Sequence, residues 1–195
     1  MRHEKTDRPG PARLLLGLRG GAGADNPQQV FFDRLRALCG NAYEGRVTTT
    51  DAADRDMAGQ RLVMHVRSCT ASEIRIPFQV GSDRSRTWVV TRTGQGLRLK
   101  HGHRHEDGRW DVRTNYGGDS DGPGSARRQT FPADQYSRDL FVREDIPASI
   151  TNVWTLEIDP DRRFVYQLSR PNRRFRVEFD LRRPVPAPPA PWGTR

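Results

Sequence analysis

Long apolar runs are missing from this chain of 195 residues. The longest uninterrupted apolar stretches reach only three residues, as at Leu14–Leu16, whereas a membrane-spanning helix needs about 20. No motif recurs at a fixed period, which excludes collagen-like, coiled-coil and solenoid proteins. The length suits a single domain with tails, and no membrane-spanning helix is expected.

Lysine is nearly absent, because only Lys5 and Lys100 among the 33 basic residues are lysine. The formal net charge of +9 falls to +4 over residues 25–182, where 26 basic residues stand against 22 acidic ones. Within that body, arginines alternate with nearby Asp and Glu, which is typical of a solvated protein face. The charge therefore does not favour nucleic acid as a partner. A basic module that binds nucleic acid or an anionic surface is kept only as the last of three functional hypotheses, after the two given below.

Recognisable catalytic motifs are also missing. The chain holds no G-x-S-x-G nucleophile elbow, no P-loop, no dinucleotide-binding fingerprint, no paired metal-binding cysteine motif and no H-E-x-x-H. The sequence therefore assigns no catalytic residue. It favours a binding protein over an enzyme and leaves enzymatic activity open.

Cysteine is scarce, with only Cys39 and Cys69 in the chain. An even pair behind a basic N-terminus is compatible with export and with a disulfide. The alternative is a pair of buried free thiols in a cytosolic protein.

The two ends of the chain differ in composition from its middle. Residues 1–24 combine a basic start, the short apolar stretch Leu14–Leu18 and the small residues Ala22–Ala24, and so resemble a degenerate secretory signal. Under that interpretation the protein is periplasmic or secreted, and if the segment is instead a disordered tail the protein is cytoplasmic. Residues 183–195 hold five prolines and are expected to form an extended tail, which leaves residues 25–182 as the folded domain.

One amphipathic helix is expected near the start of the domain. Asn26 suits the N-cap, Pro27 the first helical position, and Gly40 the C-terminal stop. Between them, Phe31 and Leu35 share one side of the helix because they are four residues apart. The pattern predicts about three to four helical turns whose apolar side packs on the domain.

After Gly40 the apolar period changes from 3.6 residues to two. Short strands separated by turn residues predict an antiparallel meander, and strands with one apolar and one polar face must close around a core. We therefore expect an all-β fold, a single antiparallel meander β-barrel of about ten strands with the helix plugging one end. The predicted strands cover residues 42–50, 61–69, 73–80, 87–93, 97–105, 109–116, 127–131, 148–158, 163–168 and 174–181.

The predicted barrel brings the two cysteines close together. If the first two strands pair as a hairpin, Tyr43 lies roughly opposite Ser68. Cys69 then lies beside the segment that leaves the helix, where Cys39 sits. A Cys39–Cys69 disulfide would fix the helix to the barrel wall.

A helix that leads into Gly40-Asn41-Ala42-Tyr43-Glu44-Gly45, followed by a long meander, resembles the calycin superfamily. Its lipocalins, fatty-acid-binding proteins and nitrobindins open their first strand with a similar glycine–x–aromatic pattern. The resemblance covers residues 25–181, and the chain is also similar to secreted bacterial proteins of this size. Lipocalins carry tryptophan where this chain has Tyr43, and nitrobindins ligate haem through a late histidine, whereas no histidine follows His105 here. The haem site of that family therefore has no counterpart by position.

Three histidines, His101, His103 and His105, alternate along one predicted strand. They project to the same side as Leu97 and Leu99, and so continue the inward side toward the barrel mouth. Neighbouring imidazoles on that side could share a metal ion or hold haem. The alternative is a polar, hydrogen-bonded or pH-responsive rim.

The interior itself favours a ligand cavity, because a closed barrel of about ten strands encloses more volume than its side chains easily fill. The alternative is a fully packed core. The first hypothesis is an extracytoplasmic, non-enzymatic protein, a monomer or dimer, that holds a small apolar or amphipathic molecule. The second is a metal- or haem-binding barrel, with or without enzymatic activity, built on the three histidines. The predicted ligand-binding residues are Trp88, Trp110, Thr114, Tyr116, Asn152, Trp154 and Tyr166.

Overall fold

The computed structural model describes Met1 and residues 26–194. The predicted signal-like segment, apart from Met1, lies outside the described residues. The helical segments are α1 (Pro27–Ala37), η1 (Ala52–Asp54), α2 (Arg55–Ala58), α3 (Gln135–Arg143) and η2 (Pro147–Thr151). The strands are β1 (Ala42–Val47), β2 (Leu62–His65), β3 (Ser68–Cys69), β4 (Glu73–Val80), β5 (Asp83–Thr93), β6 (Gly96–His103), β7 (Tyr116–Asp119), β8 (Arg128–Pro132), β9 (Val153–Asp159), β10 (Arg163–Arg170) and β11 (Arg173–Val185).

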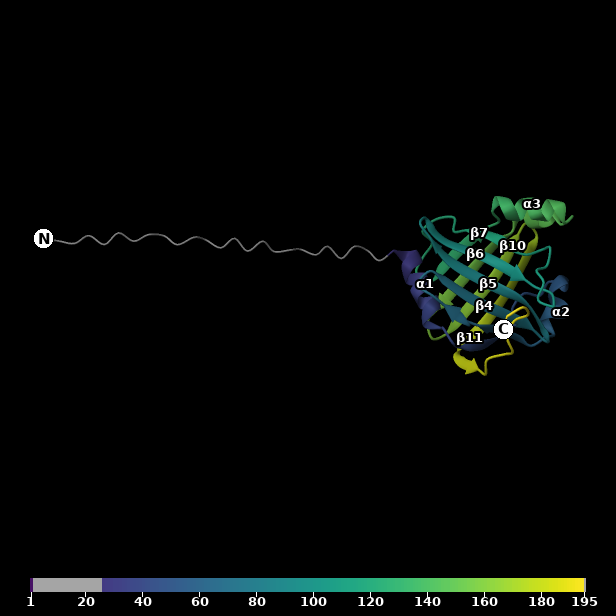
Figure 1. Ribbon diagram of the computed structural model, residues 1–195, viewed down its shortest axis with the longest axis horizontal. Coiled ribbons are helices and arrows are strands. Elements are labelled where there is room, and N and C mark those ends of the chain that lie inside the picture. Colours follow the sequence, from purple (N-terminus) through teal and green to yellow (C-terminus); the bar gives the residue numbers. More distant parts are fainter. Residues whose placement is uncertain (2–25, 195) are drawn as a thin grey trace.

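The strands form one antiparallel sheet that curls into a nearly closed barrel (Figure 1). Their order around the wall is β7-β6-β5-β4-β2-β1-β11-β10-β9-β8, with the short β3 paired to β4. Neighbours in the wall are mostly neighbours in sequence, so the predicted meander barrel is confirmed. β1 and β11 join the two ends of the meander, with Gly45 opposite Phe179.

The edge strands β7 and β8 come together to bring the barrel close to closure. The backbone amide of Asp134 donates to the carbonyl of Gly117 at 2.9 Å, and the amide of Asp121 donates to the carbonyl of Thr130 at 3.3 Å. A Cβ at Gly118 would lie only 1.8 Å from the carbonyl oxygen of Pro132. The two edges can therefore approach this closely only because position 118 is glycine.

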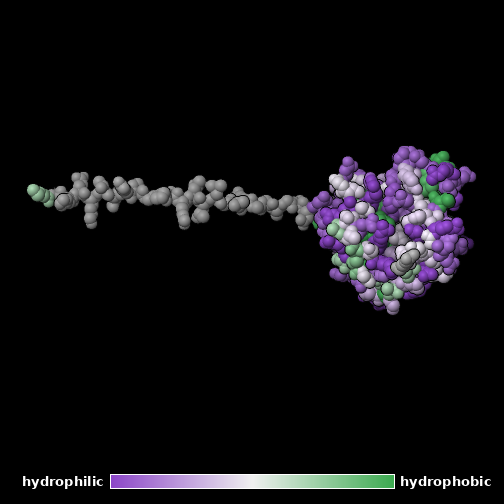
Figure 2. Space-filling model, in the orientation of Figure 1, coloured by the Kyte–Doolittle hydropathy of each residue, from purple (hydrophilic) through white to green (hydrophobic). Residues whose placement is uncertain are grey.

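The core fills most of the barrel with inward side chains from alternate strand positions. On β4, Ile74, Ile76 and Phe78 are buried, as the two-residue period predicts. Trp88 of β5 lies in the centre, with its ring stacked on Phe78 at 4.7 Å and on Tyr166 at 4.3 Å between centroids. The face of the molecule in Figure 2 is mostly hydrophilic, with a small apolar patch over α3.

Helix α1 begins where the capping pattern predicts. The Oδ1 atom of Asn26 accepts a hydrogen bond from the amide of Gln28 at 3.0 Å, and Pro27 is the first helical residue. Phe31 and Leu35 are fully buried in the common core. The Nε2 atom of Gln28 donates to the carbonyl of Gly122, so α1 contacts the chain that leaves β7. No helix among the described residues is both long and apolar enough to cross a membrane.

The Cys39–Cys69 disulfide is present, with 6.3 Å between the two Cα atoms. The register that led to it was wrong, because Tyr43 pairs with Met64 and not with Ser68. The cysteines still meet, because the amide of Gly40 donates to the carbonyl of Val66 at 2.7 Å. That bond brings the end of the helical segment to the chain just before β3.

The predicted strand 109–116 is wrong. β6 ends at His103, and the following residues leave the sheet as a loop that returns to it at Tyr116, with a single bridge between Arg104 and Trp110. The partner of β6 is the glycine-containing β7, which begins seven residues later than predicted. Similarly, residues 148–151 belong to η2 and not to the following strand, and α3 was not predicted.

The proline-rich tail folds back onto the outer face of the sheet. The backbone amide of Trp192 donates to the carbonyl of Arg84 at 3.2 Å, and the Nη1 atom of Arg84 donates to the carbonyl of Ala190 at 3.1 Å. Figure 1 shows the C-terminus in front of the strands β4 and β5. The tail is therefore part of the folded unit.

Replacing both cysteines, Cys39→Ser with Cys69→Ser, should lower the free energy of unfolding by about 3–4 kcal/mol, because the bond closes a loop with a sequence separation of 30. Guanidinium unfolding of the oxidised wild type and the double variant measures the difference. A change below about 1 kcal/mol would contradict the loop-entropy argument.

Gly118→Ala should destabilise the barrel by about 3 kcal/mol or more, since the new methyl group meets backbone and not a flexible side chain. Gly94→Ala is the matched control, because a Cβ there meets nothing within 4 Å. The control should stay within about 0.5 kcal/mol of the wild type in the same unfolding measurement. Equal stability of the two variants would show that the close approach of β7 and β8 is not required.

Candidate functional site

Two adjoining cavities lie at the end of the barrel where β6 and β10 end and β11 begins. Their volumes are about 230 Å³ and about 330 Å³. They share four lining residues, and we call the two cavities together the mouth site. The shared residues are His103, Tyr116, Tyr166 and Leu168.

Stacked aromatic rings form the inner wall of the mouth site. The ring of Tyr166 stacks on Trp88 with an angle of 8° between planes, and the ring of His101 stacks on Tyr116 at 4.7 Å between centroids. Trp154 tilts against His101 at 4.9 Å. Each ring is therefore fixed by its neighbours, which gives the wall a defined shape.

His101 is buried and its two ring nitrogens both have partners. Nδ1 lies 3.2 Å from the backbone carbonyl oxygen of Tyr116, and Nε2 lies 2.9 Å from the hydroxyl of Tyr166. A carbonyl can only accept, so Nδ1 carries the hydrogen and donates it. Burial lowers the pKa of His101 to about 3, and the neighbouring His103 acts in the same direction. The ring is therefore neutral at neutral pH, and Nε2 accepts the phenolic hydrogen of Tyr166.

His103 lies nearer the opening, on the same side of β6. Its Nε2 atom lies 2.9 Å from the hydroxyl of Tyr116. Burial lowers the pKa of His103 to about 4, and the charge of Arg86 adds to the effect. Burial also raises the pKa of Tyr116 to about 12. A histidine with such a low pKa is a weak base at neutral pH, so this arrangement suits neutral hydrogen bonding better than proton abstraction.

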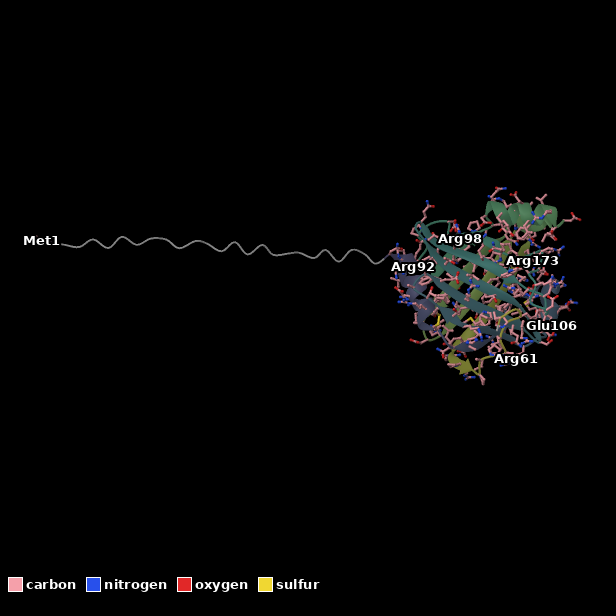
Figure 3. The ribbon with its side chains drawn as sticks, in the orientation of Figure 1. Met1, Arg61, Arg92, Arg98, Glu106 and Arg173 are labelled. Carbon is pink, nitrogen blue, oxygen red and sulfur yellow. A yellow bond between two sulfur atoms is a disulfide. The ribbon has the colours of Figure 1, made fainter. Side chains whose placement is uncertain are left out.

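Arginine side chains that form ion pairs with carboxylates lie at the rim of the mouth site. Arg173 of β11 binds the buried carboxylate of Asp54, which raises the pKa of Arg173. Arg86 of β5 pairs with Asp83. Figure 3 shows Arg173 at this end of the barrel, away from Arg92, which lies beside α1. Since these arginines are paired, they shape the rim without giving it a large unbalanced charge.

On the far side of the mouth, Arg170 reaches η2. Its Nη1 atom donates to the Oγ atom of Ser149 and to the Oδ1 atom of Asn152, each at 3.2 Å. Asn152 is buried and lines the larger cavity. This contact connects the end of β10 to the segment between α3 and β9.

The three predicted metal ligands are not brought together. His105 follows the end of β6 and is exposed, with its Nε2 atom 3.6 Å from Asp111. Within the described part of the chain, no group of three His, Cys, Asp or Glu side chains is placed to hold a metal ion. Metal or haem ligation by His101 would also break one of its two hydrogen bonds. The residues present therefore do not fit a three-histidine metal or haem centre.

Five of the seven predicted ligand-binding residues line the mouth site, and two do not. Trp110 lies outside the barrel, 54 % exposed, because its segment leaves the sheet. Thr114 is in the same segment, and its Oγ1 atom accepts a hydrogen bond from the amide of His103 at 2.8 Å. The residues that line it as predicted are Trp88, Tyr116, Asn152, Trp154 and Tyr166.

The arginines of the rim were not predicted from the sequence. Arg86 precedes Trp88 by two residues on β5 and so shares its inward side, which the strand period could have indicated. Arg173 bears the same relation to Phe175 on β11. The lining residues from η1 and α2, such as Met57, had no such signal because those short segments were not predicted.

His101→Gln should make the free energy of unfolding depend less strongly on pH below neutrality. The unfolded-state pKa of histidine is about 6.5, and that of His101 in the folded protein is about 3. Between these values the unfolded chain binds a proton that the folded protein does not, so the stability from neutral His101 is complete above about pH 6.5 and is lost as the pH falls toward about 3. The wild type should therefore show an extra slope of about 1.4 kcal/mol per pH unit.

Urea unfolding of wild type and variant between about pH 4 and pH 7 measures this slope. His105→Gln is the matched control, because it removes a histidine that lies outside the barrel. If His101→Gln keeps the slope of the wild type, the assignment of a neutral, buried His101 is wrong.

Comparisons with known proteins add no relative to this description. No protein-family model, no curated protein and no solved structure matches the chain. The nearly closed antiparallel barrel of about ten strands is compatible with a calycin-like fold.

Proposed function

We propose that this chain is a non-enzymatic binding protein that holds a small amphipathic molecule in the mouth site. The observation that carries the proposal is the pair of adjoining cavities with a shared wall of His103, Tyr116, Tyr166 and Leu168. Stacked rings offer contact area to an apolar body, and neutral imidazole and phenol groups offer hydrogen bonds that orient a polar end.

The size of the site limits the ligand to a small molecule. The cavities measure about 230 Å³ and about 330 Å³. Below them the barrel is filled by fully buried side chains such as Phe131, Phe164 and Phe179. A long acyl chain would have to displace this core, whereas a compact aromatic or alicyclic molecule fits above it.

At the end of the barrel opposite the mouth site, contacts of helix α1 support the proposal that a ligand enters only through the mouth site. Helix α1 contacts the chain after β7 through Gln28, and the carbonyl of Ala126 before β8 through Arg34 at 2.7 Å. We propose that α1 plugs this end, with the Cys39–Cys69 disulfide fixing it. A disulfide persists in oxidising compartments, which supports a periplasmic or secreted protein.

Titration with the neutral fluorescent probe N-phenyl-1-naphthylamine tests the proposal. The probe has an aromatic body and one polar group, and its fluorescence rises in apolar sites. We expect saturable binding at one site per chain. Leu168→Trp should weaken the binding about tenfold or more, because the larger ring fills volume that both cavities share.

Val142→Trp is the matched control, since it adds a ring to an exposed position of α3. It should leave the probe affinity unchanged, and circular dichroism should show that both variants are folded. The absence of saturable binding to the wild type, or an equal loss in both variants, would overturn the proposed function.

A further inference from the structure

A further cavity lies on the outside of the barrel wall, over β4, β5 and β6. Its volume is about 340 Å³, and we call it the outer groove. The tail folds over one side of it, in agreement with the position of the C-terminus in Figure 1. The lining of the outer groove includes Arg67, Arg75, Gly102, Arg104, Trp110 and Trp192.

Small outward side chains make the floor of the outer groove. Thr87 of β5 pairs with Gly102 of β6, and Val89 follows on the same side of β5. A Cβ at Gly102 would lie 3.4 Å from the ring of Trp110, so the indole lies directly against the glycine. The groove exists because small residues of the wall stand beside large residues of the flanking segments.

The charge of the outer groove is of one sign. Arg67, Arg75 and Arg104 line it, and no Asp or Glu does. Glu73 pairs with Arg75 at 2.7 Å from outside the lining. Three guanidinium groups against one carboxylate leave an excess of positive charge, which is complementary to an anion.

The side chain of one lining residue and the backbone of another are held in place. The guanidinium of Arg104 lies 3.5 Å over the ring of Trp110, and its Nη1 atom donates to the carbonyl of Gly108 at 2.6 Å. The backbone of Trp192 is held by the carbonyl of Arg84. A preorganised side chain loses less entropy when a ligand binds than a free one does.

Trp192 also has an unused donor. Its Nε1 atom is buried, and among the described residues nothing accepts its hydrogen. The donors that the outer groove offers are guanidinium and hydroxyl groups, which bind a ligand rich in acceptor oxygens.

We propose that the outer groove binds a small oxyanion attached to a ring, the class of aryl or sugar phosphate and sulfate esters. The arginines Arg67 and Arg75 receive the oxyanion, because the amide of Arg67 donates to the carbonyl of Arg75 and so places the two side by side. The tryptophans Trp110 and Trp192 contact the ring.

Calorimetric titration of the full chain with phenyl phosphate at low ionic strength tests this proposal. Phenyl sulfate, inorganic phosphate and benzyl alcohol are the comparison probes. We expect saturable binding of at least one ester and weaker binding of inorganic phosphate. Any heat measured with benzyl alcohol should be unchanged by the substitution of Arg67 and Arg75. The double variant Arg67→Gln with Arg75→Gln should bind the ester about tenfold or more weakly.

The matched control is Arg127→Gln with Arg162→Gln. It removes the same charge from two exposed arginines that both pair with Asp159, outside the groove. The control should keep the affinity of the wild type. Equal losses in the two double variants would show that the anion binds the basic surface at large, and would overturn the proposal.

Gly102→Leu separates shape from charge. The leucine fills the floor against Trp110 without changing the net charge, so ester binding should be lost while the melting temperature stays close to that of the wild type.

No saturable binding by either ester would contradict the proposal. So would tight binding of duplex DNA at physiological salt that the Arg67 and Arg75 substitutions abolish, since it would assign the groove to nucleic acid. The neutral probe for the mouth site carries no oxyanion, so failure of one site is distinguishable from failure of the other.

Discussion

The close approach of β7 to β8 is the constraint on which the rest of the barrel depends. Without it, both edges of the sheet would present unpaired backbone groups and the core would open along one side. Gly118 makes the approach possible, because a Cβ there would lie 1.8 Å from the carbonyl oxygen of Pro132. The preceding Gly117 lets β7 pair closely with β6, because a Cβ there would lie 1.9 Å from the carbonyl oxygen of Leu99. The first residue of α3 that faces this junction is Ser137, whose Oγ accepts from the amide of Gly117 at 2.7 Å.

The mouth site follows from this closure, because Tyr116 immediately precedes the glycines. Its carbonyl orients His101, and its hydroxyl contacts His103. One residue at the edge of the sheet thus sets the hydrogen bonding of two histidines on β6. Their burial keeps both rings neutral, which turns a cluster that resembles a metal site in sequence into a hydrogen-bonded wall.

Short sequence patterns correctly predicted several features of the fold. The N-cap Asn26, the alternation on β4 and the presence of the disulfide could all be inferred from short patterns. The exit from the sheet after His103 could not, because Trp110 and Val112 alternate with polar residues as in a buried strand and yet are exposed. The path of the chain there depends on which segment pairs with β6, and Gly117 of β7 fits against Leu99 where a side chain would clash. This is a contact between segments that are separate in the sequence, so a short local pattern does not reveal it.

Strand β6 shows why one wall can carry two sites of different chemistry. Its inward residues His101 and His103 face the mouth site, whereas its outward residue Gly102 and the next residue after the strand, Arg104, face the outer groove. Burial penalises charge, so His101 and His103 are neutral and suit an apolar body with a polar end. Outside, the guanidinium groups stay hydrated and charged, and the ligand they favour is an anion. Because side chains on opposite faces of a strand do not touch, substitutions on one face should leave the ligand preference of the other unchanged.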